Sequence, residues 1–167
     1  GSRRRWRVVQ GECGMTDAAA LYWEDMEVGR SATSRPHVMT RERIIAFGEE
    51  FDPQPQHVNE DAARTSMFGE LVASGWHTAS VTMRLQLEAM MGQFPGGAVG
   101  AQVDGVSWRR PVRPGDTLRA RIEVLSKRPS ASRPDRGVLT LKTTTLNQRD
   151  EAVQEMTASV LAPRRPG

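Results

Sequence analysis

Two residues that can transfer protons lie close together in the segment Phe51–His57. Asp52 supplies a carboxylate and His57 an imidazole, and enzymes commonly use these two groups to move protons near neutral pH. Pro53 and Pro55 restrict the backbone between them, because each proline fixes its own φ and holds the preceding residue in extended geometry. We therefore expect a stiff loop that presents both side chains to one water molecule. The alternative is that the pair only orders a turn, since this spacing also arises by chance.

A helix is predicted immediately before this loop. Thr40 is a suitable N-cap for a helix over 41–50, whose apolar residues recur at helical spacing and which a proline terminates. The apolar positions are Ile44, Phe47, Gly48 and Phe51. This arrangement places Asp52 at the helix end and His57 in the loop beyond it. Asn59 then caps a second, short helix.

A longer helix is predicted from Gly75 to about Met91, where glycine and proline follow. Its apolar residues form two stripes, so the helix should be buried on more than one side. One stripe consists of Trp76, Ala79, Met83, Leu87 and Met90, and the other of Val81, Leu85 and Ala89. Such a helix is typical of the centre of a domain, with a sheet wrapped round it.

The rest of the sequence is rich in strand patterns. A turn over 24–29 leads to a strand over 30–39, and 99–112 is strand-like up to the turn Pro114-Gly115-Asp116. Three stretches of alternating apolar and polar residues follow at 118–124, 139–144 and 156–160, with a polar loop over 126–137 and a frayed tail over 163–167. Long antiparallel strands that follow one buried helix predict an α+β fold.

The charge of the chain is concentrated at its start. The chain has 167 residues, enough for one domain with a substantial core, and a formal net charge of +3. Four arginines and one glutamate within residues 1–14 sum to the same +3, so residues 15–167 are neutral overall. Gly1-Ser2 is typical of a vector, and Met15 is a plausible start, so we interpret 1–14 as a disordered tag or upstream extension and 15–167 as a single domain. The basic pI of 9.7 is then no argument for nucleic-acid binding.

Several classes of protein are disfavoured by what the sequence lacks. The one cysteine, Cys13, allows no disulfide within the chain. No apolar run is long enough for a membrane span and no signal peptide is recognisable, so we expect a soluble, cytoplasmic protein. His37, His57 and His77 are evenly spaced, but their predicted places on a strand, a loop and a helix form no ligand pattern. We expect no metal and no cofactor.

Four motifs follow one another along the chain: a strand and helix, the Asp52–His57 segment, Ala73-Ser74-Gly75 at the start of the long helix, and Arg110-Pro111-Val112-Arg113-Pro114-Gly115-Asp116. This order resembles the MaoC-like dehydratases, hotdog-fold proteins related to the (R)-specific enoyl-CoA hydratases, over roughly residues 21–162. The resemblance implies a sheet wrapped round the long helix, a continuous sheet across a dimer, and active sites near the subunit interface. We therefore expect a homodimer or a dimer of dimers.

The resemblance also implies an activity. Asp52 and His57 would hold the water that is added to, or removed from, an enoyl thioester of CoA or acyl carrier protein, with a (R)-3-hydroxyacyl thioester as the hydrated product. Gly75 would polarise the thioester carbonyl through its backbone N–H at the positive end of the helix. Ser80 would support the site. The structural alternatives are a glycine required only for close packing and a serine that is simply a small polar residue.

Four residues depart from the family's usual pattern. Phe51 precedes the aspartate where glycine is typical, Gln54 replaces an asparagine, and Gln56 stands where an apolar residue is common. Ser74 replaces a frequent histidine, which removes one possible polar contact near the thioester. These changes leave the Asp and His in place but leave the acyl preference open.

Two other functions remain possible for a hotdog protein: a thioesterase, and a non-catalytic acyl-thioester binder. Thioesterases of this fold usually carry an acidic residue on the long helix, and here Glu88 is the only one, far from the helix start. This favours the hydratase, whereas a binder would share the fold. Arg109, Arg110 and Arg113 could meet CoA phosphates, although solvated arginines at strand ends are commonplace.

Overall fold

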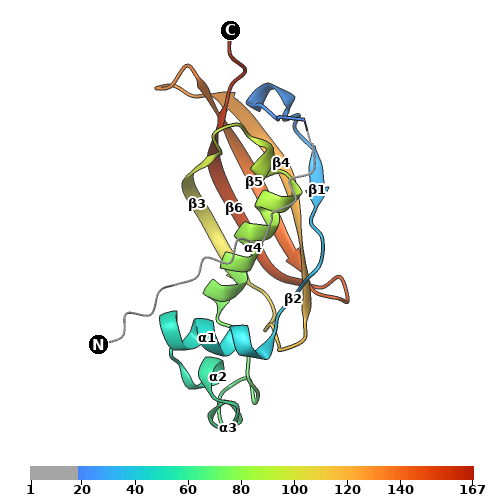
Figure 1. Cartoon of the computed structure of the whole chain (residues 1–167), viewed down its shortest axis with the longest axis vertical. Helices are drawn as coiled ribbons and strands as arrows, with labels where there is room; N and C mark the ends of the chain where they lie inside the picture. The colour runs from blue at the N-terminus through green and yellow to red at the C-terminus, as the bar shows by residue number, and fades with distance from the viewer. Residues whose placement is uncertain (1–18) are drawn as a thin grey trace, which may run out of the picture.

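A computed structural model describes residues 19–167 of the chain, and its centre is an antiparallel sheet (Figure 1). The residues interpreted as a tag, together with Cys13 and Met15, lie outside the described residues. The strand order is β1-β4-β5-β6-β3, and β2 also pairs with β4. The strands are β1 Ser31–Thr33, β2 His37–Val38, β3 Val99–Trp108, β4 Thr117–Pro129, β5 Arg136–Leu146 and β6 Ala152–Pro163. The short β1 and the long β3 are therefore the two edges of the sheet.

The long helix α4, Gly75–Ala89, lies across one face of the sheet (Figure 1). Leu85 of α4 is buried among apolar residues of β4 and β6, including Leu118 and Val153, and a second apolar cluster lies beyond the helix's C-terminus round Met90 and Ile122. Burial of this apolar surface is the main force that holds helix and sheet together. The expected α+β hotdog architecture is confirmed.

Helix α4 does not bury the apolar stripe that was expected from its sequence. Thr78, Thr82 and Gln86 are buried, although they are polar. Opposite them the sheet presents the buried polar side chains Thr143, Thr145 and Gln154. The expected apolar stripe is instead largely on the surface of the single chain, since Trp76, Met83 and Leu87 are 60%, 48% and 45% exposed. The physical reason is that hydrogen bonds across the interface compensate for the burial of the polar side chains.

Three short helices lie together beyond the end of the sheet, at the N-terminal end of α4 (Figure 1). They are α1 Arg41–Phe51, α2 Pro55–Val58 and α3 Glu60–Ala63. The predicted caps are confirmed, because the Thr40 side chain accepts from the Arg43 N–H and the Asn59 side chain accepts from the Ala62 N–H. One prediction is wrong: His57 lies on the one-turn helix α2 and not in a loop, since Pro55 at the first helical position is compatible with helix initiation.

Several strand boundaries also differ from those expected. The strand predicted over 30–39 is broken into β1 and β2, with Pro36 between them. The polar loop over 126–137 is shorter, because β4 continues to Pro129 and β5 begins at Arg136. The tail over 163–167 is tied down at its start, where Arg164 pairs with Glu24 at 3.1 Å and Arg165 with Asp25 at 2.5 Å.

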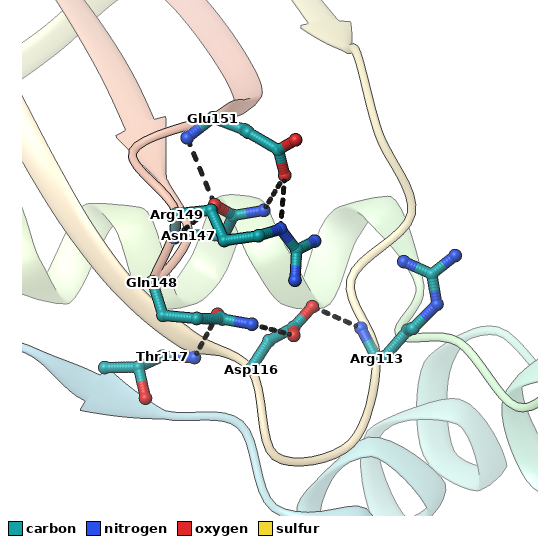
Figure 2. Close-up of polar contacts among 7 residues, drawn as sticks. All are labelled: Arg113, Asp116, Thr117, Asn147, Gln148, Arg149 and Glu151. Atoms are coloured by element: carbon teal, nitrogen blue, oxygen red, sulfur yellow. Dashed lines mark hydrogen bonds and ion pairs between the residues drawn. The ribbon is translucent and has the colours of Figure 1, made fainter.

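A polar network fixes the segment between β3 and β4 (Figure 2). The buried Asp116 carboxylate accepts from the Arg113 N–H and from the Gln148 side-chain amide, each at 2.9 Å. Gln148 lies in the turn between β5 and β6, and its carbonyl oxygen accepts from the Thr117 N–H at 3.1 Å. The predicted turn at Pro114-Gly115-Asp116 is thereby tied to a second turn. These hydrogen bonds also hold residues 109–112 in place, and those residues line a cavity.

Candidate active site

Asp52 is placed by the end of helix α1. It is the C-cap residue, and its N–H donates to the Gly48 carbonyl at 2.9 Å. Helix α2 packs directly against Gly48, where an added Cβ would lie 2.8 Å from the His57 carbonyl oxygen and 2.9 Å from a Val58 methyl group. A larger residue at position 48 would therefore push α2 away. The close approach brings Asp52 and His57 to the same place.

His57 is buried, and its ring is held from the side opposite to Asp52. Its Nδ1 lies 2.7 Å from the Val72 carbonyl oxygen, which can only accept, so Nδ1 carries the hydrogen. In the neutral ring Nε2 is then the unprotonated nitrogen. Nε2 lies 3.4 Å from Asp52 Oδ2, so a single water molecule can contact both atoms.

The Asp52 carboxylate accepts two further hydrogen bonds. The Gln54 side-chain amide donates to Oδ1 and the Ser74 hydroxyl donates to Oδ2, both at 2.7 Å. The pKa of Asp52 is lowered from its ordinary value, chiefly by the Gln54 hydrogen bond, with smaller contributions from Ser74 and from the nearby His57, although partial burial opposes the shift. Asp52 is therefore ionised at neutral pH.

Gly75 is the first residue of α4, and Ser74 is its N-cap, with a side-chain oxygen that accepts from the Trp76 N–H at 3.3 Å. The Gly75 N–H is one of the first N–H groups of the helix, which have no acceptor within the helix, and no other acceptor bonds it in residues 19–167. Gly75 is also closely packed, since an added Cβ would lie 2.5 Å from the Trp108 indole. The surroundings of Gly75 are thus compatible with both roles: an N–H donor to a thioester carbonyl, and a glycine required for close packing.

A cavity of about 450 Å³ joins these groups. Asp52, His57 and Gly75 all line it, as do the Trp76 and Trp108 side chains, whose ring centroids are 5.2 Å apart. The remaining lining residues are Gln54, Gln56, Phe68, Val72, Ala73, Thr78, Arg109, Arg110, Pro111, Val112 and Val153. The cavity therefore combines a mostly apolar wall with a carboxylate, an imidazole and the N-terminus of a helix.

Ser80 is not brought to this cavity. It lies on the exposed side of α4, and its hydroxyl donates to the Trp76 carbonyl of the same helix at 2.8 Å. Serine often makes this local bond on a helix surface. The residue is not among those that line the cavity.

The three arginines near the rim differ in their surroundings. Arg109 pairs with Glu155 at 2.7 Å, and Arg113 pairs with Glu70. Arg110 lines the cavity, and its guanidinium forms no ion pair within the part of the chain that the structure describes.

Among residues 19–167, no three His, Cys, Asp or Glu side chains gather as metal ligands would. No helix among the described residues is long and apolar enough to span a membrane.

Sequence reasoning missed the parts that Gln54, Ser74 and Trp108 play. Gln54 and Ser74 stood out only as departures from a pattern, and Ser74 was expected to remove a polar contact. The structure shows a different contact that was not predicted, in which the Ser74 hydroxyl donates to Asp52. Trp108 gave no signal in the sequence, because its contact with Gly75 joins residues that are far apart in the chain.

The sheet with its central helix, and the carboxylate and imidazole at the helix's N-terminal end, define a hotdog-fold protein with a candidate acid–base site. The MaoC-like domain family matches residues 25–147. The chain belongs to this family, which confirms the resemblance seen in the sequence.

Similarity to individual known proteins supports this assignment. The crystal structure of the MaoC-like dehydratase from Rhodospirillum rubrum has a TM-score of 0.83 and 48% sequence identity, covering 89% of this chain and 100% of that chain. An uncharacterized protein from Bacillus subtilis is 32% identical over 143 residues, 84% of this chain and 98% of the relative. The (R)-specific enoyl-CoA hydratase from Rhodospirillum rubrum is 29% identical over 150 residues, 89% of this chain and 96% of the relative.

Proposed function

We propose that the protein is a hydratase or dehydratase that interconverts an enoyl thioester, carried by CoA or acyl carrier protein, and a (R)-3-hydroxyacyl thioester. The observation that carries the proposal is the 3.4 Å approach of His57 Nε2 to Asp52 Oδ2 inside a cavity that Gly75 also lines. A carboxylate and an imidazole at this separation can hold one water, and a helix N-terminus can stabilise negative charge beside it. The similarity to the (R)-specific enoyl-CoA hydratase from Rhodospirillum rubrum supports the same activity.

In the hydration direction, His57 is the general base. Its Nδ1 hydrogen is held by Val72, so Nε2 can accept a proton from the water as the water oxygen bonds to the β-carbon of the enoyl group. The electrons of the double bond move onto the α-carbon and the thioester carbonyl. The imidazolium beside the ionised Asp52 then returns a proton to the α-carbon. Asp52 orients the water and stabilises the imidazolium, and dehydration follows the reverse path.

The Gly75 N–H is the donor for the thioester carbonyl oxygen, which gains negative charge during the reaction. A free N–H at the start of a 15-residue helix combines a hydrogen bond with the positive end of the helix dipole. One such donor is commonly worth about 10²- to 10³-fold in rate. The Trp108 indole packed on Gly75 keeps this donor in place.

The test is a screen of short, branched and medium-length trans-2-enoyl-CoAs. Hydration removes the absorbance of the conjugated double bond, and chiral analysis of the product should give the (R)-3-hydroxyacyl thioester. A thiol reagent in parallel assays detects free CoA, which a thioesterase would release and a hydratase would not. Release of free CoA, or binding without any conversion across the series, would contradict the proposal.

We also propose that the protein is a homodimer or a dimer of dimers, assembled through the β3 edge. Nine of the ten residues of β3 are exposed, and the edge of β3 that faces away from β6 can pair with a strand of a second copy. The exposed apolar residues next to it, Val99 and Val103 on β3 and Met83 and Leu87 on α4, form a surface that a second copy would cover.

A further inference from the structure

A second cavity, of about 280 Å³, lies between α4 and the strands β3, β5 and β6. Its walls are mostly apolar, with Met83 and Met91 on one side and Leu141, Met156, Ala158 and Val160 on the sheet. Two polar side chains line it, Gln86 and Gln102. The Gln102 amide is exposed and donates to Asp104, so Gln86 is the buried polar group of this cavity.

The second cavity follows the first along the same three elements. On α4 the lining passes from Thr78 to Met83, on β6 from Val153 to Met156, and on β3 from Trp108 to Val103. The strand register agrees, because Trp108 pairs with Gln154 while Val106 pairs with Met156 and Val103 with Ala158. From Gly75 to Gln86 the helix rises about 16 Å. The second cavity is thus placed to receive the far end of a chain whose thioester lies at Gly75.

Gln86 has a buried donor without a partner. The residue is 3% exposed, and its side-chain oxygen accepts from the Thr143 hydroxyl at 3.0 Å. Its Nε2 is fully buried and bonds nothing in the described part of the chain. Buried amide groups are nearly always satisfied in folded proteins, so an unused buried donor calls for a physical explanation, and a group that enters the cavity and accepts its hydrogen bond is one.

A second unsatisfied amide belongs to Gln154 of β6, next to Val153 of the first cavity. Gln154 is fully buried, its oxygen accepts from the Trp108 indole N–H at 2.9 Å, and its Nε2 also has no partner among the described residues. The neighbouring buried threonines differ in this respect, since Thr82 and Thr145 bond each other at 2.7 Å. Gln86 and Gln154 therefore each keep an unused amide donor, whereas Thr82 and Thr145 satisfy one another.

We propose that the acyl group of the substrate carries a neutral oxygen on its distal part, a carbonyl, hydroxyl or ether, which accepts a hydrogen bond from Gln86 Nε2 in the second cavity. This inference rests on the proposed function and specifies its substrate class. The oxygen is neutral because the residues that line the cavity include no lysine, arginine or histidine, and an unpaired carboxylate would be costly to bury there.

The experiment compares length-matched pairs of trans-2-enoyl-CoAs, one with a hydrocarbon chain and one with a keto or hydroxyl group near its far end. For the wild-type protein, kcat/KM should favour the oxygenated member by at least about tenfold, because a site built to bond an oxygen discriminates against the analogue without it. In Gln86→Met, which has an apolar side chain of similar length, the ratio should fall to one or below.

The matched control is Gln93→Met, the same substitution in the turn after α4, at a residue that lines neither cavity. It should keep the wild-type ratio. A wild-type ratio near one overturns the inference without any variant, and so does a ratio that Gln86→Met leaves unchanged. Crotonyl-CoA, whose acyl group is too short to reach Gln86, separates the two claims: hydration of crotonyl-CoA without discrimination between the pairs overturns only the inference, whereas no hydration of any thioester overturns the proposed function as well.

Discussion

The neighbours of Asp52 favour its ionised form. A carboxylate beside an imidazole could share a proton with it, but the hydrogen bonds from Gln54 and Ser74 favour the charged form of Asp52. In the mechanism that we propose, the proton needed at the α-carbon travels through His57. The pKa of Asp52 therefore decides the roles that we propose for the pair.

We predict that Gln54→Leu raises the pKa of Asp52. The Gln54 amide is the largest contribution to the lowered pKa, and once it is lost the opposing effect of burial remains. Titration of the Asp52 carboxyl carbon by NMR measures the change directly. Gln56→Leu is the control, because Gln56 bonds Gln54 and not Asp52 and should affect the pKa much less. An Asp52 pKa that is the same in Gln54→Leu and the wild type would show that this hydrogen bond has no such role.

The sequence alone was enough to single out Asp52 and His57 as candidates, because prolines and flanking motifs surround them. It could not assign Ser74 to Asp52, since these residues are 22 positions apart and meet only when the start of α4 lies beside the end of α1. The placement of His57 on a helix was missed for a related reason. A single helical turn started by proline leaves little periodicity to detect.

At the scale of the element, the contact between α1 and α4 contains a buried histidine. His77 of α4 stacks on Phe47 of α1, with ring centroids 4.7 Å apart and planes 6° from parallel. Its Nδ1 is buried without a partner in the described residues. Burial, together with the charges of His37 and Arg43, lowers the pKa of His77 from 6.5 to about 4. The folded protein therefore favours the neutral ring at this contact.

We predict that this contact makes the protein less stable in mild acid. Between pH 6.5 and about 4 the unfolded chain binds a proton at His77 and the folded chain does not, so the free energy of unfolding falls as the pH falls. The loss approaches about 3 kcal/mol at the lower end of this range. His77→Phe keeps an aromatic ring on Phe47 but cannot titrate, so urea unfolding at several pH values should show a flatter profile.

Part of the pH dependence should remain in that variant, because burial also lowers the pKa of His37. Combining His77→Phe with His37→Gln should flatten the profile further. A wild-type profile that is flat between pH 6.5 and 4, or one that His77→Phe does not alter, would contradict this account.

The limits and the burial of α4 were predictable to different degrees. Gly75 and the glycine and proline after Met91 mark its ends, so the helix was found from local signals. The buried face of α4 could not be predicted from such local signals, because Thr82 and Gln86 are buried against hydrogen-bond partners on β5. A hydrophobic pattern carries no information about such distant polar partners.

The single chain leaves apolar surface uncovered along β3 and α4. Aromatic residues are only 5% of the chain, so surface shared between two copies would add substantially to the buried apolar area. The second cavity lies under this edge, with Val103 of β3 among its lining residues. A dimer through β3 would therefore cover both the outer edge of this strand and the cavity wall.

We predict that Val99→Lys shifts the protein from dimer to monomer. Val99 is 57% exposed at the start of β3, and a lysine on an edge strand opposes pairing with a second copy. Sedimentation velocity at micromolar concentration measures the change. Val28→Lys is the control, since Val28 is similarly exposed at 60% but lies in the turn before β1. A wild-type protein that sediments as a monomer would contradict the proposed assembly.

We propose that Asp52 and His57 act together on one water, and comparing the single variants with the double variant measures this coupling. On the best enoyl-CoA substrate, Asp52→Asn and His57→Ala should each lower kcat by at least about 10²-fold, the usual scale for a positioned acid or base. Their effects should be strongly non-additive, so that the double variant is scarcely slower than the slower single variant. If both single variants retain activity within a few-fold of the wild type, Asp52 and His57 only support the structure and the protein is better described as an acyl-thioester binder.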